Sequence, residues 1–567
     1  MKKVEKKWWK DRSKGKVFEN ASDAFSHILA ARYQEIPENN TAVLAIQEQI
    51  ETITKTIIDD IKHKRKILLW GDYDVDGTCS ILIWMKTLKA LGCEAFDYHI
   101  PTRNSGYGLS IEGLKQTITN HKTVITMDNG ITAKDESEWC EDQGIKLIVT
   151  DHHTFTNQNI TAAPFIFNPK LFDENKYSHL CGSGISYLIC MKLCGEFYKN
   201  KLNKEYAELQ YHLAFFAAMG TICDFVPLIG VNRSIFNHAR KALMNTNDPA
   251  LSHLGYVLNL KDLDLNGENF GYTIGPLINA CGRMDNMDCV IDYFMCEMKS
   301  ECGIYFKKMK ENLLKRKLQE AMTNNIINDE LNNNKYISQN HVMFGSPDFH
   351  LGIVGLSATR YTNELNKPCL FYTTGDICHG SGRSIKGINL LSILKEIDNL
   401  FITLGGHEMA FGFSFKEEDA ILIDSHIDMR ILELIENNHD LFDHNIEYDG
   451  ELNAKCLDVD LAKRIDSIEP FGMSYPKPVF KVKGEVLKKE LIGKNKEHSQ
   501  VFIRDNTGLP RKIMFFFQNP EVKGGDIINI LITISMTMWK GRATPLIKAV
   551  DSSAKELGFK DNKIIIN

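Results

Sequence analysis

Short apolar runs alternate with amphipathic stretches through the first half of the chain. KILLW, TVITM and KLIVT are apolar runs bounded by charged residues or glycine, a pattern typical of buried strands. TCSILIWMKTLKALG repeats its apolar residues at helical spacing, and AKDESEWCEDQG has the length and polarity of a crossover helix. This alternation predicts an α/β fold built on a mostly parallel sheet.

Acidic residues and histidines follow each of these strands. GDYDVDG at 71–77 follows the first, MDNG at 127–130 the second and TDHH at 150–153 the third, while CDFVPL at 223–228 follows an apolar helical stretch. Loops at the carboxyl ends of parallel strands gather along one edge of the sheet, so we expect these segments to meet there. The converging side chains would be Asp74, Asp76, Asp128, Asp151, His152, His153 and Asp224.

This set of side chains points to bound cations and to phosphoester hydrolysis. Several carboxylates in one crevice repel one another unless cations neutralise them. Oxygen ligands with one or two imidazoles suit Mn²⁺ or Mg²⁺ better than ions that prefer thiolates. Two such ions about 3.5 to 4 Å apart clamp the attacking and leaving oxygens of a phosphoryl displacement. Any one of these segments alone would more often be a solvated cap or a surface histidine pair, but the four together favour a two-metal site.

The same segments resemble the DHH phosphoesterases, and more closely those members that degrade single-stranded DNA from its 5′ end. The triplet that gives the family its name is Asp151, His152 and His153. Further matches follow in family order and extend over nearly the whole chain: PTRNSGYGLS at 101–110, GPLINACGRMDN at 275–286, GSGRS at 380–384, GGHEMAFGF at 405–413 and IEPFGMSYPKP at 468–478.

The resemblance implies a role for each metal-site residue. Asp74 would bind the first of two Mn²⁺ or Mg²⁺ ions, Asp128 would bridge both, and the second would be held by Asp76, His152 and Asp224. His153 would contact the scissile phosphate or position water, so that it acts with Asp128 and His152 as a catalytic residue.

Two acidic residues of these motifs receive supporting roles. The spacing of Asp72 assigns it no ligand role, and we expect it to cap a helix or to support a ligand. Asp151 is expected to orient a neighbouring histidine, because histidine ligands usually need an outer hydrogen-bond partner.

The resemblance also implies phosphate contacts. These would come from Arg103, Ser381 and Arg383 at the terminal 5′-phosphate, and from Arg283, Gly405, Gly406 and His407 along the backbone. Bidentate arginine contacts attract and orient such oxygens. The chain departs from the family pattern at Cys281, where a small residue is expected, and in the short GGH signature. Neither departure removes a charged or ligating group.

The pattern of elements changes along the second half of the chain. Residues 286–335 are helical and highly charged, 336–444 alternate between strands and helices, and 445–567 read as five strands with turns between them. We therefore expect five parts: a basic N-terminal arm at 1–20, a DHH catalytic domain at 21–285, a connecting helix at 286–335, a smaller DHH-associated α/β domain at 336–444 and an OB-fold β-barrel at 445–567.

Aromatic residues near both ends of the chain are candidates for nucleic-acid contacts. An OB-fold commonly binds single strands through aromatic and cationic side chains. We expect Trp539 to be exposed on its binding face, with Phe502, Phe516, Lys481, Arg504 and Lys540 as further candidates. In the N-terminal arm, tryptophans 8 and 9 either stack on bases or pin the arm to the first domain, and pinning is favoured.

Composition limits the class of protein. The 567 residues carry a formal net charge of -6, which argues against a protein that coats DNA with its whole surface but leaves room for a basic groove. The chain shows no signal peptide and no apolar stretch long enough to span a bilayer. Its 14 cysteines form no CxxC pair, so reduced thiols in the cytoplasm are expected.

The predicted function is metal-dependent 5′ to 3′ degradation of single-stranded DNA, preferably with a 5′-phosphate, to nucleoside 5′-monophosphates. The resemblance implies work in DNA repair and recombination as a monomer, with a helicase and a single-strand-binding protein as possible partners and no membrane. Two alternatives stay open: a DHH phosphodiesterase for short oligonucleotides or cyclic dinucleotides, and an inactive DHH-like scaffold that binds DNA. The OB-like domain argues against the first, and the full ligand set argues against the second.

Overall fold

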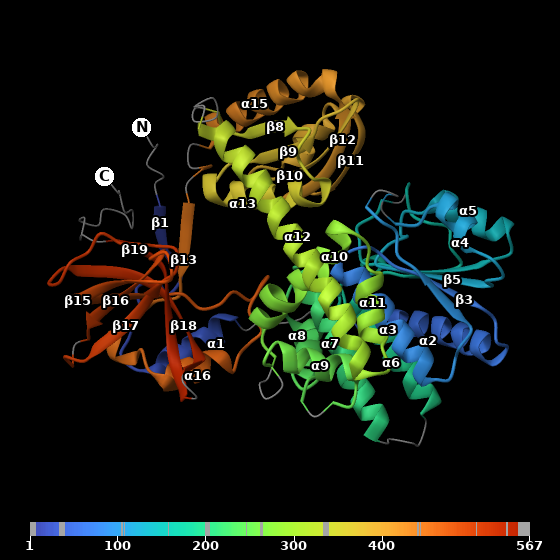
Figure 1. The fold of residues 1–567 in the computed structure, drawn as a ribbon, viewed down its shortest axis with the longest axis horizontal. Helices are drawn as coiled ribbons and strands as arrows, with labels where there is room; N and C mark the ends of the chain where they lie inside the picture. The colour runs from blue at the N-terminus through green and yellow to red at the C-terminus, as the bar shows by residue number, and fades with distance from the viewer. Residues whose placement is uncertain are drawn as a thin grey trace. The chain divides into compact units, whose positions relative to one another are not determined.

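The computed structural model describes residues 7–32, 40–103, 106, 108–156, 158–198, 204–244, 246–260, 265–332, 339–438, 441–442, 444–505, 507–539 and 542–553 (Figure 1). The chain divides into two compact units. The central unit comprises Gln34–Gln319 and Pro470–Tyr475, and the terminal unit comprises Met1–Tyr33, Glu320–Glu469 and Pro476–Asn567. Within the described parts of the chain, no helix is both long and apolar enough to cross a membrane.

A five-stranded parallel sheet forms the middle of the central unit. Its strand order is β4-β3-β5-β6-β7, and all four strand pairs are parallel, as the sequence predicts. In chain order the strands are β3 (Ile67–Trp70), β4 (Phe96–His99), β5 (Thr123–Met127), β6 (Lys146–Thr150) and β7 (Phe165–Phe167).

Helices cover both faces of this sheet. Alternate residues of β3 enter different apolar clusters: Ile67 and Leu69 pack with α3 and its neighbours, while Leu68 and Trp70 pack towards α4 and α5. Strands buried on both faces are apolar at successive positions, which explains the continuous runs in the sequence. The helices of the unit are α2 (Asn40–Lys62), α3 (Val75–Ala90), α4 (Ile111–Thr117), α5 (Lys134–Asp142), α6 (Gly182–Phe197), α7 (Lys204–Cys223), α8 (Gly230–Ala239), α9 (Pro249–Val257), α10 (Gly275–Met284) and α11 (Asp288–Met295), with helical turns η1 (Pro169–Leu171) and η2 (Asn269–Ile274).

The strand order places a topological switch point between β3 and β5. The chain leaves β3 towards β4 on one side and later returns to β5 on the other side of β3. In open α/β sheets ligands bind at the carboxyl ends of the strands next to such a point. The acidic loop 71–77 follows β3 and Asp128 follows β5, so both motifs lie at this crevice.

The stretch 286–335, expected as one connecting helix, contains two. Helix α11 ends at Met295, Cys296 is extended, and α12 (Lys299–Asn332) begins three residues later. The apolar side of α11, with Val290 and Phe294, is buried in the core of the central unit, so α11 belongs to that core. Helix α12 begins in the central unit and ends in the terminal unit.

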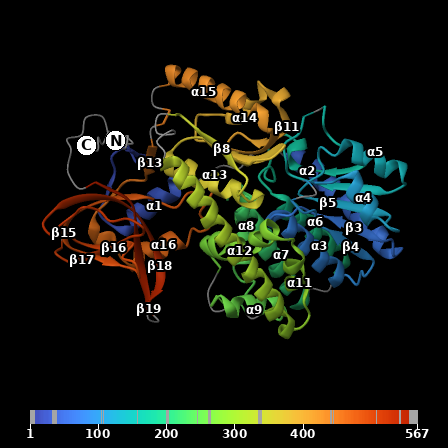
Figure 2. The same cartoon turned by 45° about the horizontal axis from the view of Figure 1, so that its top comes forward.

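The terminal unit contains a second, mixed sheet with strand order β11-β12-β10-β9-β8. Its strands are β8 (Val342–Ser346), β9 (Cys369–Thr373), β10 (Ile377–Arg383), β11 (Phe401–His407) and β12 (Ala410–Lys416). Helices α13 (Leu351–Leu365) and α15 (Ala420–Asn437) lie on opposite faces of this sheet, and the short α14 (Leu390–Lys395) shares the apolar cluster of α15 (Figure 1, Figure 2). This is the smaller α/β domain that the sequence predicts.

Five strands near the C-terminus close into a barrel. They are β15 (Phe480–Ile492), β16 (His498–Arg504), β17 (Pro510–Phe515), β18 (Ile527–Trp539) and β19 (Arg542–Ser553). The barrel closes because β15 pairs with both β16 and β18, while β17 and β19 pair in parallel. The expected OB-fold is therefore present, with α16 (Val459–Asp466) contacting β18.

The N-terminal segment is part of the terminal unit. Strand β1 (Lys7–Asp11) pairs with β13 (His444–Tyr448), and β2 (Val17–Phe18) pairs with β14 (Glu451–Leu452). Trp9 is buried against Leu531 of the barrel, and its Nε1 donates to Asp551 Oδ2 at 2.8 Å. The arm is thus pinned, as favoured, but to the barrel and not to the first domain.

The first helix also belongs to the terminal unit. Helix α1 (Ala21–Arg32), which the sequence predicts to be part of the catalytic domain, instead contacts α16 of the terminal unit. The Arg32 guanidinium donates to both carboxylate oxygens of the buried Asp449 at 3.2 and 3.3 Å. The domain limits were inferred from the pattern of apolar residues, and this pattern does not reveal a buried ion pair.

Candidate metal centre

Three carboxylates come from the loop that joins β3 to α3 and from the first turn of α3. Asp74 caps α3, because its Oδ1 accepts a hydrogen bond from the Gly77 N–H at 3.0 Å. Asp76 lies in the first turn of the same helix and is buried. Asp72 is also buried, and its Oδ1 has no hydrogen-bond partner among the described residues. The capping role that we considered for Asp72 therefore belongs to Asp74, and Asp72 presents an oxygen to the site.

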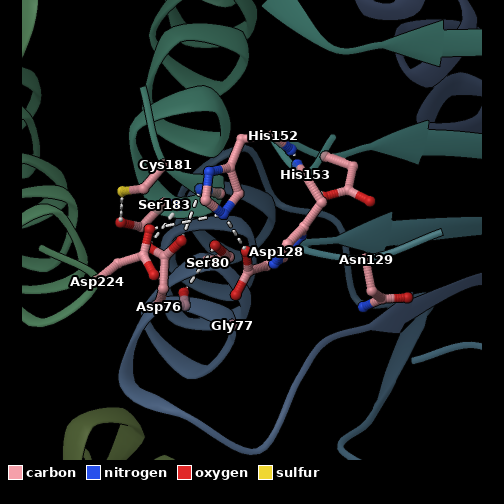
Figure 3. A network of polar contacts seen from close by, with 12 residues as sticks. Asp76, Gly77, Ser80, Asp128, Asn129, His152, His153, Cys181, Ser183 and Asp224 are labelled. Atoms are coloured by element: carbon pink, nitrogen blue, oxygen red, sulfur yellow. Dashed lines mark hydrogen bonds and ion pairs between the residues drawn. The ribbon is translucent and has the colours of Figure 1, made fainter. Parts of the chain in front are cut away.

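His152 lies between two carboxylates from different elements. Its Nε2 is 3.0 Å from Asp128 Oδ1 and 3.6 Å from Asp224 Oδ2 (Figure 3). Asp128 follows β5 in a left-handed conformation with φ 65°, and Asp224 follows the last residue of α7. Helix α7 thus ends at the same edge as the strands, which the position of Asp224 requires.

Asp151 orients the histidine pair. Its Oδ1 accepts from the backbone N–H of His152 at 2.7 Å and of His153 at 3.1 Å, and it lies 2.8 Å from His153 Nδ1. The other oxygen, Oδ2, accepts from the Ile131 N–H at 2.9 Å. With both oxygens occupied by the protein, Asp151 acts as the outer partner that the sequence predicts.

The first turn of α6 holds Asp76 in place. The backbone N–H groups of Gly182 and Ser183 donate to Asp76 at 2.6 and 3.0 Å, so this helix start binds a carboxylate of the protein itself. A Cβ on Gly182 would lie 2.6 Å from Asp128 Cβ, and one on Gly220 of α7 would lie 2.1 Å from Asp76 Oδ1. Glycine at these two positions lets the helices approach the carboxylates.

The carboxylates are too close to be ionised together without cations. Burial and then the charge of neighbouring carboxylates raise the pKa of Asp72, Asp128 and Asp224 well above the ordinary 3.8, and the same causes raise the pKa of Asp74. Divalent cations would remove this repulsion. Carboxylate oxygens with an imidazole nitrogen are the ligands that Mn²⁺ and Mg²⁺ accept.

Potential ligand atoms fall into three sets of three, each within 4.8 Å of one another. The sets are Asp72, Asp74 and Asp128; Asp76, His152 and Asp224; and Asp128, His152 and His153. Asp128 belongs to two of them and joins the group from the β3 loop to the histidines. Every predicted metal-site residue is therefore brought to this edge, together with Asp72.

Two arginines predicted to bind phosphate lie in the central unit. The Arg103 guanidinium stacks 4.3 Å from the centre of the Tyr73 ring, and its Nε donates to the Gly282 carbonyl at 3.2 Å. Its charge lowers the pKa of Asp72 and Asp74, after the larger effects named above. Arg283 follows Gly282 on α10 and acts electrostatically on Tyr73. Both cations are therefore held beside the acidic loop.

Lys170 is a further cation of the site and was not among the residues predicted from the sequence. It lies in η1, directly after β7, and its charge acts on Asp151 and Asp224. Burial lowers the pKa of this lysine. The rule that located the acidic loops would have found it, since NPK follows the fifth strand as MDNG and TDHH follow the others.

The predicted pocket for the terminal phosphate includes two residues of β10. The Arg383 guanidinium donates to Ser381 Oγ and to the Gly382 carbonyl, both at 2.8 Å, and to Thr359 Oγ1 at 3.1 Å. These partners are neutral, and burial lowers the pKa of Arg383. A half-buried guanidinium held by neutral groups is suited to receive an anion. Ser381 and Arg383 belong to the terminal unit, and their part in the site stays a prediction.

The two glycine motifs lie on strands and not in turns. In GSGRS, a Cβ on Gly380 or Gly382 would lie 2.4 or 2.2 Å from the ring of Phe413 or Phe411, so these glycines make room for aromatic packing. Gly406, with φ 135°, also meets Phe411, whereas a Cβ on Gly405 would meet open space. His407 ends β11 and is exposed. The side chain of Trp539 and all of Lys540 lie outside the described residues.

Profiles of three domain families match successive parts of the chain. The DHH family, N-terminal domain, matches residues 66–215, the DHHA1 domain matches 334–431 and the RecJ OB domain matches 448–551. The chain therefore contains a DHH domain. Of the candidate ligands, only Asp224 lies outside the DHH match, and it enters the site from the end of α7.

Relatives of this DHH protein extend over most of its length. The single-stranded-DNA-specific exonuclease RecJ of Haemophilus influenzae is 28% identical over 81% of this chain and 82% of the relative, and that of Escherichia coli is 27% identical over 84% and 85%. Among solved structures, RecJ from Thermus thermophilus in complex with Mn²⁺ aligns with a TM-score of 0.78 at 19% identity, over 97% of this chain and 80% of that one. The fold is therefore shared over nearly all of this chain.

In protein stripped of divalent ions, the His153 ring should titrate near pH 9 and the His152 ring near pH 4. Burial alone would lower the pKa of His153, but the hydrogen bond and charge of Asp151 raise it from 6.5 to about 9. Burial and the charge of His153 lower the pKa of His152 from 6.5 to about 4. Ring-proton NMR titration of the metal-free protein measures both values.

These pKa shifts make the stability of the metal-free protein depend on pH. The folded pKa of His153 lies above its ordinary value, so the stabilisation by its contact with Asp151 is fully present below pH 6.5 and is lost as the pH rises through about 9. The pKa of Asp151 is lowered to about 2, so its contribution is lost as the pH falls through that value. An Asp151→Asn variant should lose the raised His153 pKa, and an unchanged titration would contradict this account.

Proposed function

We propose that this chain is a divalent-metal-dependent exonuclease that degrades single-stranded DNA from the 5′ end and releases nucleoside 5′-monophosphates in DNA repair and recombination. The observation that carries the proposal is the division of the acidic side chains into two ligand groups at one sheet edge. Asp72, Asp74 and Asp128 form one group, and Asp76, His152 and Asp224 form the other. Two Mn²⁺ or Mg²⁺ ions match this division, and the relatives named above are single-stranded-DNA-specific exonucleases.

The chain's own residues prepare the phosphodiester for cleavage. When bound, the two ions supply Lewis acidity for the attacking and leaving oxygens. His153, kept charged at neutral pH by Asp151, is placed to contact a phosphate oxygen next to the ligands. Arg103 and Arg283 add positive charge on the side of the β3 loop, where they hold the phosphates of the strand.

We assign recognition of the terminal 5′-phosphate to Ser381 and Arg383. Support comes from their mutual hydrogen bond and from the neutral surroundings of the guanidinium, which lacks an ion-pair partner among the described residues. A 5′-phosphate supplies the missing negative charge. Gly405 and His407 would contact backbone phosphates, because the open space beside Gly405 leaves room for close approach.

The outward face of the barrel carries a row of residues suited to a single strand. Phe502 on β16 is paired with Lys488 on β15 and with Lys512 on β17, and the Lys488 ammonium lies 4.5 Å from the centre of its ring. Val501 and Ile503 on either side are buried, so Phe502 faces outward, half exposed. An aromatic ring between two cations can stack on a base while the lysines meet phosphates.

Phe502→Ala should weaken binding of an oligothymidylate by about 5- to 150-fold, because one base–aromatic stack contributes about 1 to 3 kcal/mol. Fluorescence anisotropy in EDTA, which prevents cleavage, measures the dissociation constant. Phe197→Ala is the matched control, since Phe197 is an exposed phenylalanine on α6 that we place in no binding surface. Equal affinities of Phe502→Ala and wild type would remove the barrel face from the proposal.

Strands labelled at either end test the proposed reaction. Purified protein with Mn²⁺ should release labelled mononucleotide first from the 5′ end, and a 5′-phosphate should accelerate release over a 5′-hydroxyl. Duplex of the same sequence should resist degradation. Release from the 3′ end would overturn the polarity, equal attack on duplex would overturn the substrate class, and full activity in EDTA would overturn the metal assignment.

A further inference from the structure

Two aromatic side chains on elements that adjoin Asp224 are unusually exposed. Phe225, the residue directly after Asp224, is 75% exposed, and Tyr272 of η2 is 83% exposed. Burying a phenylalanine contributes about 1.5 to 3 kcal/mol, so one left in water next to a functional site suggests that a ligand covers it. Neither residue has a role in the site described above.

Phe225 also holds an unfavourable backbone conformation. Its φ is 55°, in the left-handed region, where residues other than glycine, asparagine and aspartate are uncommon. Such strain persists only where the surrounding structure enforces it, and it concentrates at functional sites. The chain thus turns sharply between a metal-site carboxylate and an aromatic ring that faces solvent.

The element that carries Tyr272 adjoins the same turn. η2 is a π-helical turn, a rare conformation that is frequent at functional sites. It packs on the end of α7: a Cβ on Gly271 would lie 3.5 Å from the Ile222 side chain, and one on Gly275 would lie 2.5 Å from Cys223 Sγ. The element that carries Tyr272 therefore packs against the last two residues of α7, which precede Asp224 and Phe225 in the chain.

The far end of this turn is fixed as well. The Leu228 N–H donates to the Met473 carbonyl at 3.0 Å, in the short segment 470–475 that belongs to the central unit. Arg233 of α8 anchors that segment by donating to the Pro470 carbonyl at 3.1 Å and by stacking 4.1 Å from the centre of the Tyr475 ring. Phe225 is thus presented by a turn that is held at both ends, so ordering it on binding costs little.

We propose that Phe225 and Tyr272 form a nucleobase-binding platform that stacks on a base of the strand whose phosphate lies at the metal centre. The inference rests on the proposed function and adds a contact to a base near the metal centre, where the assignments above concern only phosphates. An aromatic face accepts any base, because every base has a π-face, so the platform holds the strand without reading its sequence. Duplex DNA keeps its bases stacked on one another and cannot offer such a face.

The first test removes the aromatic ring from the protein and single bases from the substrate. Phe225→Ala should raise KM for a 5′-phosphorylated oligothymidylate by about 5- to 100-fold while kcat changes less, and Phe225→Trp should restore the wild-type KM. Oligonucleotides with one abasic site, placed in turn at each of the first positions, remove the base from the substrate in the same way as Phe225→Ala removes the ring from the protein. At one position the wild type should lose affinity, while Phe225→Ala should be indifferent to the missing base.

The second test uses the backbone strain. Asparagine tolerates the left-handed conformation, so Phe225→Asn should raise the midpoint of thermal unfolding by about 2 to 4 °C while it raises KM as the alanine variant does. A merely structural phenylalanine would lose stability and binding together. Tyr256→Ala, which removes an exposed tyrosine from α9, is the control and should change neither quantity.

The outcomes separate this inference from the proposed function. An unchanged KM in Phe225→Ala and in Tyr272→Ala, with full 5′ to 3′ activity, would overturn the platform and leave the exonuclease assignment intact. A KM that is raised in Phe225→Ala and stays equally high in Phe225→Trp would also overturn the platform. A wild-type protein that degrades neither end of a single strand would instead overturn the proposed function itself.

Discussion

Asp128→Asn should reduce nuclease activity by about 10³-fold or more, a larger loss than the roughly 10- to 100-fold typical of residues behind the metal ligands. Asp128 contributes to two of the three ligand sets, so its loss affects both groups of oxygens. Asparagine keeps the shape of the side chain and tolerates the φ of 65°, whereas alanine would add backbone strain. Release of labelled mononucleotide under saturating Mn²⁺ measures the effect.

The same variant should not lose stability in the absence of metal. Burial and neighbouring carboxylates raise the pKa of Asp128, which means that its charge is unfavourable in the folded protein. A neutral amide removes this repulsion, so the unfolding midpoint in EDTA should stay the same or rise. Stabilisation by Mn²⁺, which reaches about 2.7 kcal/mol at 100 times the dissociation constant, should be lost.

Asp135→Asn provides the matched control for charge. Asp135 is an exposed carboxylate in the first turn of α5, and its replacement should leave activity and metal-induced stabilisation unchanged. Normal activity in Asp128→Asn would contradict the two-metal assignment. A large loss of metal-free stability would show instead that Asp128 supports the fold.

Gly220→Ala should cause the second large effect, with loss of both activity and stability. The added Cβ would lie 2.1 Å from Asp76 Oδ1 and 2.1 Å from Ser183 Oγ, closer than any real contact, in the buried part of α7. Overpacking of this kind costs about 1 to 3 kcal/mol and would push Asp76 off the N–H groups of α6. We expect activity to fall by about 100-fold or more, with a lower unfolding midpoint.

Gly195→Ala separates this clash from the general effect of the substitution. Gly195 lies inside α6, and a Cβ there meets nothing within 4 Å. Since alanine favours the helix, this change should stabilise the protein by about 0.5 to 1 kcal/mol and leave activity unchanged. Calorimetry and the end-label assay measure both variants, and full activity in Gly220→Ala would refute the close approach.

The sequence predicts the sheet and its acidic edge because one physical signal governs both. A strand buried on two faces must be apolar at successive positions, and polar residues can return only where it ends, so TVITM followed by MDNG fixes both the strand and the site. The same signal located TDHH after β6. Asp224 required only that α7 end at this edge, and it does.

The pattern of apolar residues does not predict other features, because they depend on single contacts. Whether Asp72 or Asp74 caps α3 is decided by one hydrogen bond to Gly77, since both carboxylates stand at plausible spacing. The place of α1 depends on contacts with α16 and on the ion pair with Asp449, more than 400 residues away in the chain. GSGRS has the composition of a turn, yet its glycines admit aromatic rings from a neighbouring strand.

The pairing of β1 with β13 and of β2 with β14 bears on how the protein is made. Residues 7–18 are synthesised before their strand partners at 444–452, which follow more than 400 residues later. The sheet of the central unit, whose strands all lie between residues 67 and 167, is complete long before then. During translation β1 and β2 therefore remain unpaired until residues 444–452 have been made, and we expect the domain that follows them to fold earlier.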